Sequence, residues 1–430
     1  MEIDSPFLKR HLTDRIESAL NDTPAVLVGG ARQSGKTTLC QWIAERRKAS
    51  ILTFDDGATL SAAKADPHGF VAALDGPVFL DEIQRAPELL PAIKLAIDKK
   101  RTAGRFLMTG SSNVLTLPRV SESLAGRMAV LTLWPLSIGE IEGAREGFVD
   151  AVLAKDDPPW PKNGLSRERL LNLVLRGGYP EVVAREAAAR RTAWFGSYVT
   201  TILQRDVRDI ASIAGLTELP RLLQLLAART SSILNVAEVS RSSALPHTTL
   251  MRYLSLLEMT FLIHRIPAWS GSRGRRLIKA PRIMLGDTGL LAYLAGFTRD
   301  RSVLDPGAIG PMLENFVAVE ILKQLSWGRT QASLFHFRSH AGQEVDFVLE
   351  ADAGTLVGIE VKASTKVGPA DFRGLEALRQ TTGRRFRRGV ILYTGERSLP
   401  FGDSYWALPM SAVWKLAPAG DRNPPYNRRH

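Results

Sequence analysis

A glycine-rich segment near the amino terminus has the residue spacing of a phosphate-binding loop. Residues 30–37 read Gly-Ala-Arg-Gln-Ser-Gly-Lys-Thr, which fits the pattern G-x-x-x-x-G-K-S/T. Glycines let successive backbone N–H groups turn toward an anion, and a following helix adds the positive end of its dipole. Lys36 is expected to contact the β- and γ-phosphates of ATP, and Thr37 to bind Mg²⁺. The expected nucleotide-binding residues are Gly30, Ala31, Arg32, Gln33, Ser34, Gly35, Lys36, Thr37 and Thr38.

An acidic pair follows a second apolar run, where a nucleotide-hydrolysing site would require it. Residues 77–80 are Pro-Val-Phe-Leu, and Asp81 and Glu82 come directly after them. Asp81 is expected to hold Mg²⁺ through water, and Glu82 to polarise the attacking water as a general base. A phosphotransferase does not need the second carboxylate, so the pair favours ATP hydrolysis. The alternative is that both carboxylates only cap a helix.

Two further positions are candidates for catalysis, and each has a plain structural alternative. The polar segment 109–113 ends an apolar run, so Asn113 or Ser112 could position water beside the γ-phosphate or simply form a turn. Arg127 could reach the γ-phosphate in a neighbouring subunit as an arginine finger, or it could be an ordinary surface residue.

The elements that must position these residues are strands of a parallel sheet. The first 135 residues alternate short apolar runs with segments of helical length, which favours an α/β fold. The apolar runs are continuous rather than alternating, as in strands buried on both faces. The five expected strands are Ala25–Val28, Ile51–Phe54, Pro77–Asp81, Arg105–Thr109 and Met128–Leu133.

Further motifs follow the phosphate loop along nearly the whole chain. They include Leu-Asp-Glu-Ile-Gln-Arg at 80–85, Leu-Ala-Gly-Arg at 124–127, Arg-Gly-Gly-Tyr-Pro-Glu at 176–181, Asp-Thr-Gly-Leu at 287–290 and Leu-Glu-Asn at 313–315. Together they resemble a family of prokaryotic AAA+ ATPases whose C-terminal half is a domain of unknown function. The resemblance implies ATP binding with Mg²⁺ and a sheet order of 5-1-4-3-2. It also suggests a homo-oligomer, with a hexamer as the AAA+ arrangement, and leaves a monomer open.

The segment after about residue 235 has the pattern of a winged helix. A first helix begins near Val236, a Ser-Ser-Ala-Leu-Pro turn follows, and a second helix starts at about His247. Two expected strands, Phe261–Trp269 and Arg275–Leu285, flank a Ser-Gly-Ser-Arg-Gly turn. The alternative is a protein-docking piece. The residues expected to contact DNA are Thr248, Arg252, Arg273, Arg275 and Arg276.

Near the carboxyl end, acidic residues alternate with apolar ones in two successive strands. Residues 343–350 place Glu344, Asp346 and Glu350 on one face, and after a turn residues 355–362 place Glu360 and Lys362 on a common face. Asp346 and Glu360 are expected to bind Mg²⁺, and Lys362 to orient or activate the attacking water. Glu314, on the preceding helix, is a further candidate ligand.

This arrangement resembles the PD-(D/E)XK nuclease superfamily, with Asp346, Glu360 and Lys362 at its three motif positions. An amphipathic helix at about Met312–Leu325 precedes the two strands, and a helix and a strand follow at about Asp371–Arg379 and Arg388–Tyr393. Two alternatives remain open: a solvated charge pair on an edge strand, and a nuclease fold without catalysis. The basic cluster at 384–388 could guide a nucleic-acid backbone or form an exposed loop.

Composition limits the class of protein. With 430 residues, 45% hydrophobic and 23% charged, the chain is expected to fold into several domains. It has no apolar stretch of about 18 residues and no signal-peptide pattern, which predicts a cytoplasmic protein without membrane contact. The single cysteine, Cys40, excludes an internal disulfide. The net charge of +12 is compatible with a nucleic-acid partner and equally with a basic composition unrelated to binding.

The sequence therefore predicts an α/β chain with five parts. They are a P-loop AAA+-type ATPase domain at 1–135, a helical lid or linker at 136–215, a winged helix at 216–300, a nuclease-like domain at 301–416 and a disordered tail at 417–430. The leading interpretation is an ATP-hydrolysing protein that acts on duplex or branched DNA under nucleotide control. One alternative is a nucleotide-dependent switch or scaffold that recruits a protein partner, with a non-catalytic C-terminal domain. Another is a metal-dependent nuclease gated by ATP.

Overall fold

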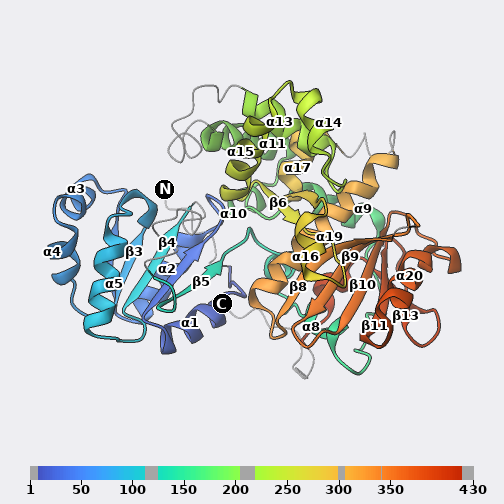
Figure 1. Ribbon diagram of the computed structural model, residues 1–430, viewed down its shortest axis with the longest axis horizontal. Helices are drawn as coiled ribbons and strands as arrows, with labels where there is room; N and C mark the ends of the chain where they lie inside the picture. The colour runs from blue at the N-terminus through green and yellow to red at the C-terminus, as the bar shows by residue number, and fades with distance from the viewer. Residues whose placement is uncertain (1–7, 112–123, 204–217, 299–305, 340, 419–430) are drawn as a thin grey trace. The chain divides into compact units, whose positions relative to one another are not determined.

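The computed structural model describes residues 8–111, 124–203, 218–298, 306–339 and 341–418, which form two compact units (Figure 1). The first unit extends to Leu136 and includes Met259–Phe261. The second contains Ser137–Glu258 and the chain from Leu262 onward. Each unit has its own sheet and is described separately below.

The first unit is built on a five-stranded sheet in the order β2-β3-β4-β1-β5. Every neighbouring pair is parallel, and in the register Val28 of β1 stands beside Thr109 of β4 and Leu131 of β5. The order 5-1-4-3-2 implied by the family resemblance is confirmed. The strands are β1 (Ala25–Gly29), β2 (Ser50–Thr53), β3 (Val78–Asp81), β4 (Phe106–Gly110) and β5 (Met128–Thr132).

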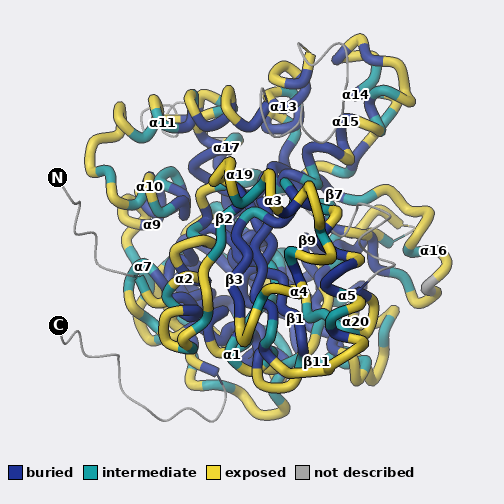
Figure 2. Tube along the Cα trace, turned by 90° about the vertical axis from the view of Figure 1, so that its left-hand side faces the viewer, coloured by how far each residue is buried: buried dark blue, intermediate teal, exposed yellow. Residues whose placement is uncertain are grey.

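Helices cover both faces of this sheet. Helices α1 (Thr13–Asp22) and α2 (Lys36–Arg46) pack on one face, and α4 (Pro67–Ala72) and α5 (Leu89–Lys99) pack on the other, with α3 (Gly57–Ala65) beside α4. Strands β1 and β3 are buried at every position, as the dark blue tube in Figure 2 shows. Burial on both faces explains why these strands are continuous apolar runs in the sequence.

The second unit begins with helices that include the segment expected as a lid or linker. They are α7 (Ile138–Glu142), α8 (Phe148–Leu153), α9 (Arg167–Arg176), α10 (Pro180–Val183), α11 (Ala188–Thr201) and α13 (Leu219–Ala228). Helices α7 and α8 are bound to the long helix α19 (Ile309–Trp327), because the N–H of Ile138 donates to Glu320 at 3.0 Å and that of Val149 donates to Gln324 at 3.2 Å. The start of the segment is therefore fastened to the C-terminal sheet domain.

Two helices and a short hairpin follow, in the order expected for the winged helix. They are α14 (Val236–Ser243), α15 (His247–Met259), β6 (Ile263–Ile266) and β7 (Arg282–Leu285), and β6 pairs with β7 in antiparallel register. The strand expected at Arg275–Leu285 is wrong in its first part, because Arg273–Ile278 forms a short helix, α16. The chain after β6 is already paired elsewhere: the N–H of Trp269 donates to the carbonyl of His336 at 2.6 Å. Residues 275–281 therefore have no strand there to pair with.

A mixed sheet in the order β12-β13-β11-β10-β9-β8 forms the rest of the second unit. Helix α20 packs on one face and α19 on the other. Neighbouring strands from β8 to β10 are antiparallel, whereas β11 is parallel to β10 and to β13. The elements are β8 (Ala332–Arg338), β9 (Glu344–Ala351), β10 (Leu356–Lys362), α20 (Arg373–Thr382), β11 (Phe386–Tyr393), β12 (Leu399–Pro400), β13 (Tyr405–Pro409) and α21 (Ala412–Lys415), with α17 (Thr288–Leu294) before α19.

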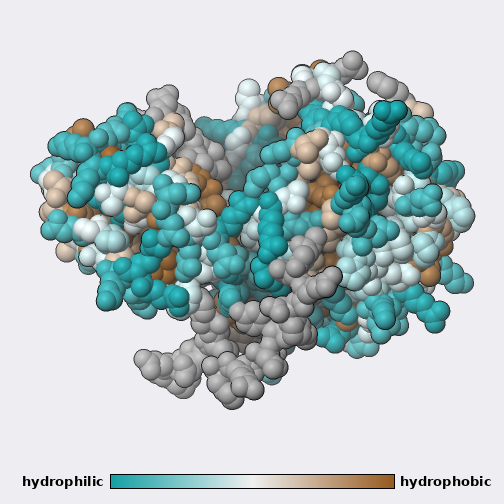
Figure 3. Space-filling model, turned by 90° about the horizontal axis from the view of Figure 1, so that it is seen from below, coloured by the Kyte–Doolittle hydropathy of each residue, from teal (hydrophilic) through white to brown (hydrophobic). Residues whose placement is uncertain are grey.

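The surface carries little continuous apolar area on the side that Figure 3 shows, where hydrophilic residues predominate and hydrophobic residues form small patches. Within the described ranges, no helix has the length and hydrophobicity needed to cross a membrane. Most of the tail expected to be disordered, residues 419–430, lies outside the described residues.

Asn315 ties α19 to β7 and provides a test of this packing. Its Oδ1 accepts the N–H of Leu285 at 2.8 Å and the hydroxyl of Thr230 at 2.7 Å, and its Nδ2 donates to the carbonyl of Leu285 at 3.1 Å. Asn315→Ala should lower the free energy of unfolding of the second unit by about 3 kcal/mol, because it leaves buried polar groups without partners. Thermal unfolding measures this, with the exposed Ser255→Ala as the matched control. Equal midpoints for the two variants would contradict the assignment.

Candidate functional site

The phosphate loop lies between β1 and α2 and has a backbone that only certain residues can adopt. Gly30, Gln33 and Gly35 have φ values of +152°, +60° and +94°, so the chain turns repeatedly through left-handed conformations. A Cβ on Gly30 would stand 2.1 Å from the carbonyl oxygen of Leu133, so a side chain cannot be placed there. Such successive turns form the concave row of N–H groups that binds anions.

The Mg²⁺-binding residues expected from the sequence lie together at the carboxyl end of β3. The hydroxyl of Thr37 donates to Oδ1 of Asp81 at 3.0 Å, and the hydroxyl of Thr109 donates to the same oxygen at 2.5 Å. Asp81 is 5% exposed and receives only neutral hydroxyl donors in these bonds. An oxygen pair of this kind, one carboxylate and one hydroxyl beside a phosphate loop, fits Mg²⁺.

Glu82 is held beside this pair by contacts on both its backbone and its side chain. Its N–H donates to Oγ1 of Thr109 at 3.0 Å, and its carboxylate accepts the hydroxyl of Ser111 at 2.8 and 2.9 Å and the amide of Gln84. Its φ of +58° is unusual for a residue with a side chain. Strained backbones of this kind are concentrated at functional sites. Sequence analysis did not identify Ser111 or Gln84.

Arg10 is a third residue that sequence analysis missed. Its guanidinium is buried and donates to the carbonyl of Ser34 in the phosphate loop at 2.8 Å and to the carbonyl of Trp134 at 2.6 Å. It therefore clamps the loop to the chain that follows β5. No local pattern could have revealed it, because Arg10 is 24 residues from one partner and 124 from the other.

Of the two further catalytic candidates, only Arg127 lies within the described residues, and it does not take part in this arrangement. Arg127 precedes β5, at the opposite end of the sheet from the phosphate loop, and its Nε lies 2.5 Å from Oδ1 of Asp98. A finger role for Arg127 would therefore concern the nucleotide of a neighbouring copy in a homo-oligomer. Asn113 lies outside the described residues.

Burial sets the electrostatics of the site. It lowers the pKa of Lys36 to about 8, although the carboxylates of Glu82 and Asp81 oppose the shift, and the Lys36 ammonium donates to the carbonyl of Ala31 at 2.8 Å. Burial also raises the pKa of Asp81 and of the Cys40 thiol. In the free protein, the protonated form of Lys36 is thus only moderately favoured over the neutral amine near neutral pH. Bound phosphate groups would stabilise the protonated form.

The three residues expected at the C-terminal site do lie together on the β9–β10 hairpin. The ammonium of Lys362 lies 2.9 Å from Oε1 of Glu360, and the N–H of Asp346 donates to Oε2 of Glu360 at 3.4 Å. Oδ2 of Asp346 accepts the N–H of Val361 at 2.9 Å. The spacing in the sequence predicted this juxtaposition because side chains alternate along a strand.

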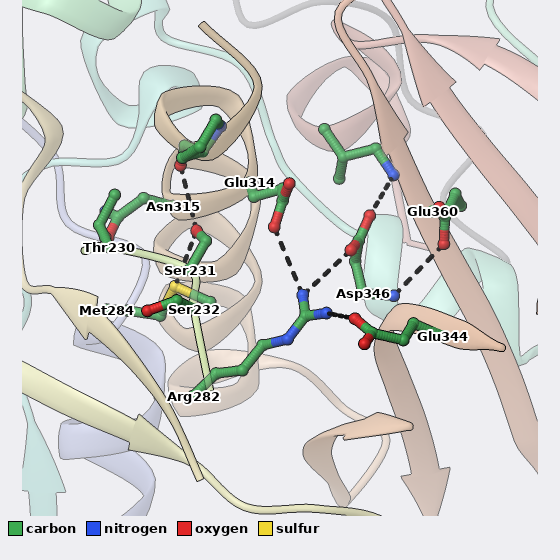
Figure 4. Close-up of polar contacts among 12 residues, drawn as sticks. Thr230, Ser231, Ser232, Arg282, Met284, Glu314, Asn315, Glu344, Asp346 and Glu360 are labelled. Atoms are coloured by element: carbon green, nitrogen blue, oxygen red, sulfur yellow. Dashed lines mark hydrogen bonds and ion pairs between the residues drawn. The ribbon is translucent and has the colours of Figure 1, made fainter. Parts of the chain in front are cut away.

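A guanidinium that was not predicted stands among these carboxylates. Nη1 of Arg282 lies 3.0 Å from Asp346 and 3.4 Å from Glu314, and its Nη2 lies 2.9 Å from Glu344 (Figure 4). Among the residues that the structure describes, no group of three or more His, Cys, Asp and Glu side chains is placed to hold a metal ion. The arrangement therefore does not fit the Mg²⁺ expected at Asp346 and Glu360.

Two carboxyl groups of this cluster have raised pKa values. Burial, followed by the carboxylate of Asp346, raises the pKa of Glu314 to about 8 and that of Glu360 to about 7. The adjacent guanidinium of Arg282 and ammonium of Lys362 oppose these shifts without cancelling them. Burial is the largest cause of both upward shifts, and the carboxylate of Asp346 adds to it.

The residues expected to contact DNA fall into three groups. Thr248 and Arg252 lie exposed on α15. Arg276, expected to contact DNA from the wing, lies instead on the short helix α16. There its guanidinium pairs with Glu350, with Nη2 3.1 Å from Oε1, and lies over the rings of Trp269 and Phe335. The side chains of Arg273 and Arg275 lie outside what the structure describes.

Comparison with known proteins divides the chain into three matched segments. Residues 22–142 match the family described as an AAA domain, and residues 167–301 and 309–413 match two domains of unknown function, DUF8612 and DUF4143. The first match agrees with the strand order, the phosphate loop and the Thr37–Asp81 pair. Residues 22–142 thus have the strand order and phosphate loop of a P-loop nucleotide-binding domain and are similar to the AAA domain family over that segment.

Full-length similarity leads to proteins whose names state no function. Two uncharacterised proteins, from Mycobacterium bovis and Mycobacterium tuberculosis, are each 29% identical over 407 residues, which is 94% of this chain and 84% of theirs. A Walker-type ATPase of Pyrococcus abyssi is 15% identical, with a TM-score of 0.38 over 67% of this chain and 96% of its own. The RuvB Holliday junction branch migration motor of Thermotoga maritima is 18% identical, with a TM-score of 0.27 over 60% and 89%. TM-scores this low support no inference about this chain.

The titration of Lys36 should make ATP binding depend on pH. Above about pH 8 the free protein loses the ammonium charge, so the affinity for ATP should fall about tenfold per pH unit, and binding should take up a proton. Calorimetry between about pH 7.5 and about pH 9.5, in buffers that differ in ionisation enthalpy, measures both quantities. Lys36→Arg is the matched control, because a guanidinium does not titrate in this range. A wild type with the same pH profile as Lys36→Arg would contradict the assignment.

Proposed function

We propose that the protein is an ATP-hydrolysing enzyme of the AAA type that acts on DNA, with the nucleotide state controlling its engagement. The position of Glu82 carries the hydrolytic part of this proposal. Its carboxylate accepts the hydroxyl of Ser111 and lies next to the Thr37–Asp81 pair. ATP hydrolysis needs a general base at this position, whereas the fold does not need a carboxylate there.

Each residue of the site has a defined role in this reaction. Backbone N–H groups of residues 30–36 and the ammonium of Lys36 bind the β- and γ-phosphates. Thr37 and Asp81 would hold Mg²⁺, which when bound neutralises phosphate charge. Glu82 accepts a proton from the attacking water as the water oxygen bonds to the γ-phosphorus and the bond to the ADP oxygen breaks. The contact with Ser111 keeps the Glu82 carboxylate oriented for that transfer.

A short stretch of chain connects the ATPase domain to α7, and through it nucleotide binding could affect the rest of the protein. The N–H of Leu133 donates to the carbonyl of Gly29 at 2.7 Å, and Arg10 holds Trp134 to the phosphate loop. Shortly after Trp134, the chain enters α7, where buried Glu320 of α19 accepts the N–H of Ile138. A shift of the loop on ATP binding would therefore act directly on the chain that leads into α7.

The DNA-binding part of the proposal is carried by α15. Thr248 and Arg252 are exposed on this helix, which is the second helix of the expected winged helix, and the chain has a net charge of +12. Phosphate contacts from such residues would give salt-sensitive affinity that depends little on base sequence. Because Arg276 is paired with Glu350, the helix rather than the segment after β6 is the proposed contact.

A second candidate is a nucleotide-dependent switch that recruits a protein partner and uses the C-terminal domain without catalysis. The observation that favours it is the guanidinium of Arg282 within the carboxylate cluster, where a nuclease would need a metal ion. A nuclease gated by ATP is the least supported of the three interpretations for the same reason.

Removing the proposed base should separate ATP binding from hydrolysis. Glu82→Gln keeps the side-chain shape and an acceptor for Ser111, so ATP affinity should change little while the single-turnover rate falls by about 100-fold or more. Glu88→Gln, an exposed position before α5, is the control and should keep the wild-type rate. A Glu82→Gln enzyme that hydrolyses ATP at the wild-type rate would exclude Glu82 as the base.

DNA action is tested by ATPase rates of the wild type and Lys36→Ala with duplex, single-stranded and branched DNA at two salt concentrations. We expect a DNA-stimulated rate that Lys36→Ala abolishes, and weaker DNA binding in Arg252→Ala with a salt slope reduced by about 1. The exposed Arg167→Ala on α9 is the charge-matched control. A Lys36-dependent rate that every DNA leaves unchanged, with no DNA binding at low salt, would reject DNA action and favour the switch.

A further inference from the structure

Two neighbouring aliphatic side chains of α16 project into solvent. Leu277 is 88% exposed and Ile278 is 83% exposed, whereas the other exposed large hydrophobic residues of the described chain lie between 36% and 46%. The yellow tube of α16 in Figure 2 marks the same exposure. Large aliphatic side chains are usually buried in the core. An adjacent pair of them held in solvent therefore indicates a contact with another molecule.

The helix that carries this pair is anchored by Arg276, whose side chain is only 15% exposed. Its Nε donates to the carbonyl of Ser270 at 2.6 Å, and its Nη2 lies 3.1 Å from Oε1 of Glu350. The guanidinium also lies over the ring of Trp269, 5.4 Å from the ring centre. These contacts hold α16 against the C-terminal sheet domain, so the apolar pair has a fixed base.

Basic residues surround the apolar pair. Residues 273–279 include four arginine or lysine residues and no acidic residue. The anchoring carboxylate, Glu350, also pairs with Arg385. This shared carboxylate brings a second basic segment, residues 384–388, next to α16, and four of its five residues are arginine. A partner of this surface must therefore combine negative charge with an apolar interior.

Duplex DNA has the chemistry that this surface complements. Its phosphates carry the negative charge that exposed Lys279 and Arg384 would meet, and its stacked bases form an apolar interior. In proteins that kink DNA, aliphatic side chains beside basic residues enter between neighbouring bases and unstack them. An anionic lipid bilayer also combines charge with an apolar interior. Separating stacked bases requires a fixed wedge, whereas entry into fluid lipid does not, so the anchoring of α16 favours DNA.

We propose that Leu277 and Ile278 form a wedge that enters between stacked bases of DNA and unstacks them. The inference rests on the proposed action on DNA and adds to it a contact with bases. This contact differs from the phosphate contacts proposed for α15. Arg276 remains excluded as a phosphate contact, because its guanidinium holds the wedge in place.

Fluorescence of 2-aminopurine, a base analogue that is quenched by stacking, tests the wedge. The full-length protein is titrated at low salt into duplex and branched DNAs that carry the analogue at successive positions, until anisotropy shows that binding is saturated. Wild-type protein should raise the emission about twofold or more at one or two adjacent positions. Leu277→Ser/Ile278→Ser should lower this increase at saturation by at least about fivefold, because the short polar side chains do not fill the gap between bases.

Two further variants separate the wedge from a general loss of apolar surface. Leu277→Met/Ile278→Met keeps apolar side chains of similar size and should retain the increase in emission. Leu399→Ser removes an aliphatic side chain that is 39% exposed on β12, and it should give the wild-type emission. If Leu399→Ser loses the increase as the serine double variant does, the effect is a general loss of apolar surface and the proposal is wrong.

The outcomes distinguish this inference from the proposed function on which it rests. Wild-type protein that binds DNA without raising the emission at any position overturns the wedge and leaves the action on DNA standing. A serine double variant with the wild-type emission does the same. Wild-type protein that binds no DNA at low salt rejects both. Binding to vesicles of phosphatidylserine and phosphatidylcholine that only the serine double variant loses, with its DNA emission unchanged, would assign the pair to a membrane and overturn the wedge.

Discussion

A buried helix can carry polar side chains only if each finds a partner, and α19 meets this requirement with partners from several parts of the chain. Glu320 binds the start of α7, Gln324 binds α8 and the carbonyl of Val413, and Asn315 binds β7 and Thr230. An unpaired buried group of this kind costs roughly 1–3 kcal/mol. The second unit is thus organised around the polar groups of one helix as well as around its apolar core.

The two acidic sites of the protein differ in how their buried carboxylates are compensated. Asp81 accepts from the neutral hydroxyls of Thr37 and Thr109, which supply no opposite charge and leave the carboxylate to be compensated by a cation. Asp346 faces the guanidinium of Arg282, which supplies the opposite charge permanently. In the sequence, the acidic residue at the end of β3 and the acidic residues that alternate along β9 look like similar candidate metal ligands. The chemistry that each supports depends on whether the neighbouring donor is neutral or charged.

Much of the ATPase site was predictable because its determinants are local. Residues 30–37 are contiguous, and the conformation of such a loop follows from the glycines within it. Asp81 and Glu82 directly follow an apolar strand, and the carboxyl ends of parallel strands share one edge of a sheet. In contrast, Arg10 reaches the site only through the fold, since its partners are 24 and 124 residues away in the sequence.

The sequence by itself determined the strands of the parallel sheet, the phosphate loop and the hairpin that aligns Asp346 with Glu360, because hydrophobic periodicity and glycine positions act over a few residues. Only the tertiary structure shows that Arg276 and Arg282 form ion pairs with carboxylates. In the sequence, both look like ordinary basic residues. Pairing of Trp269 with His336 left residues 275–281 without a strand partner, and the fixed backbone of β7 placed Arg282 among three carboxylates. Charge pairing across a fold depends on distances that no local pattern encodes.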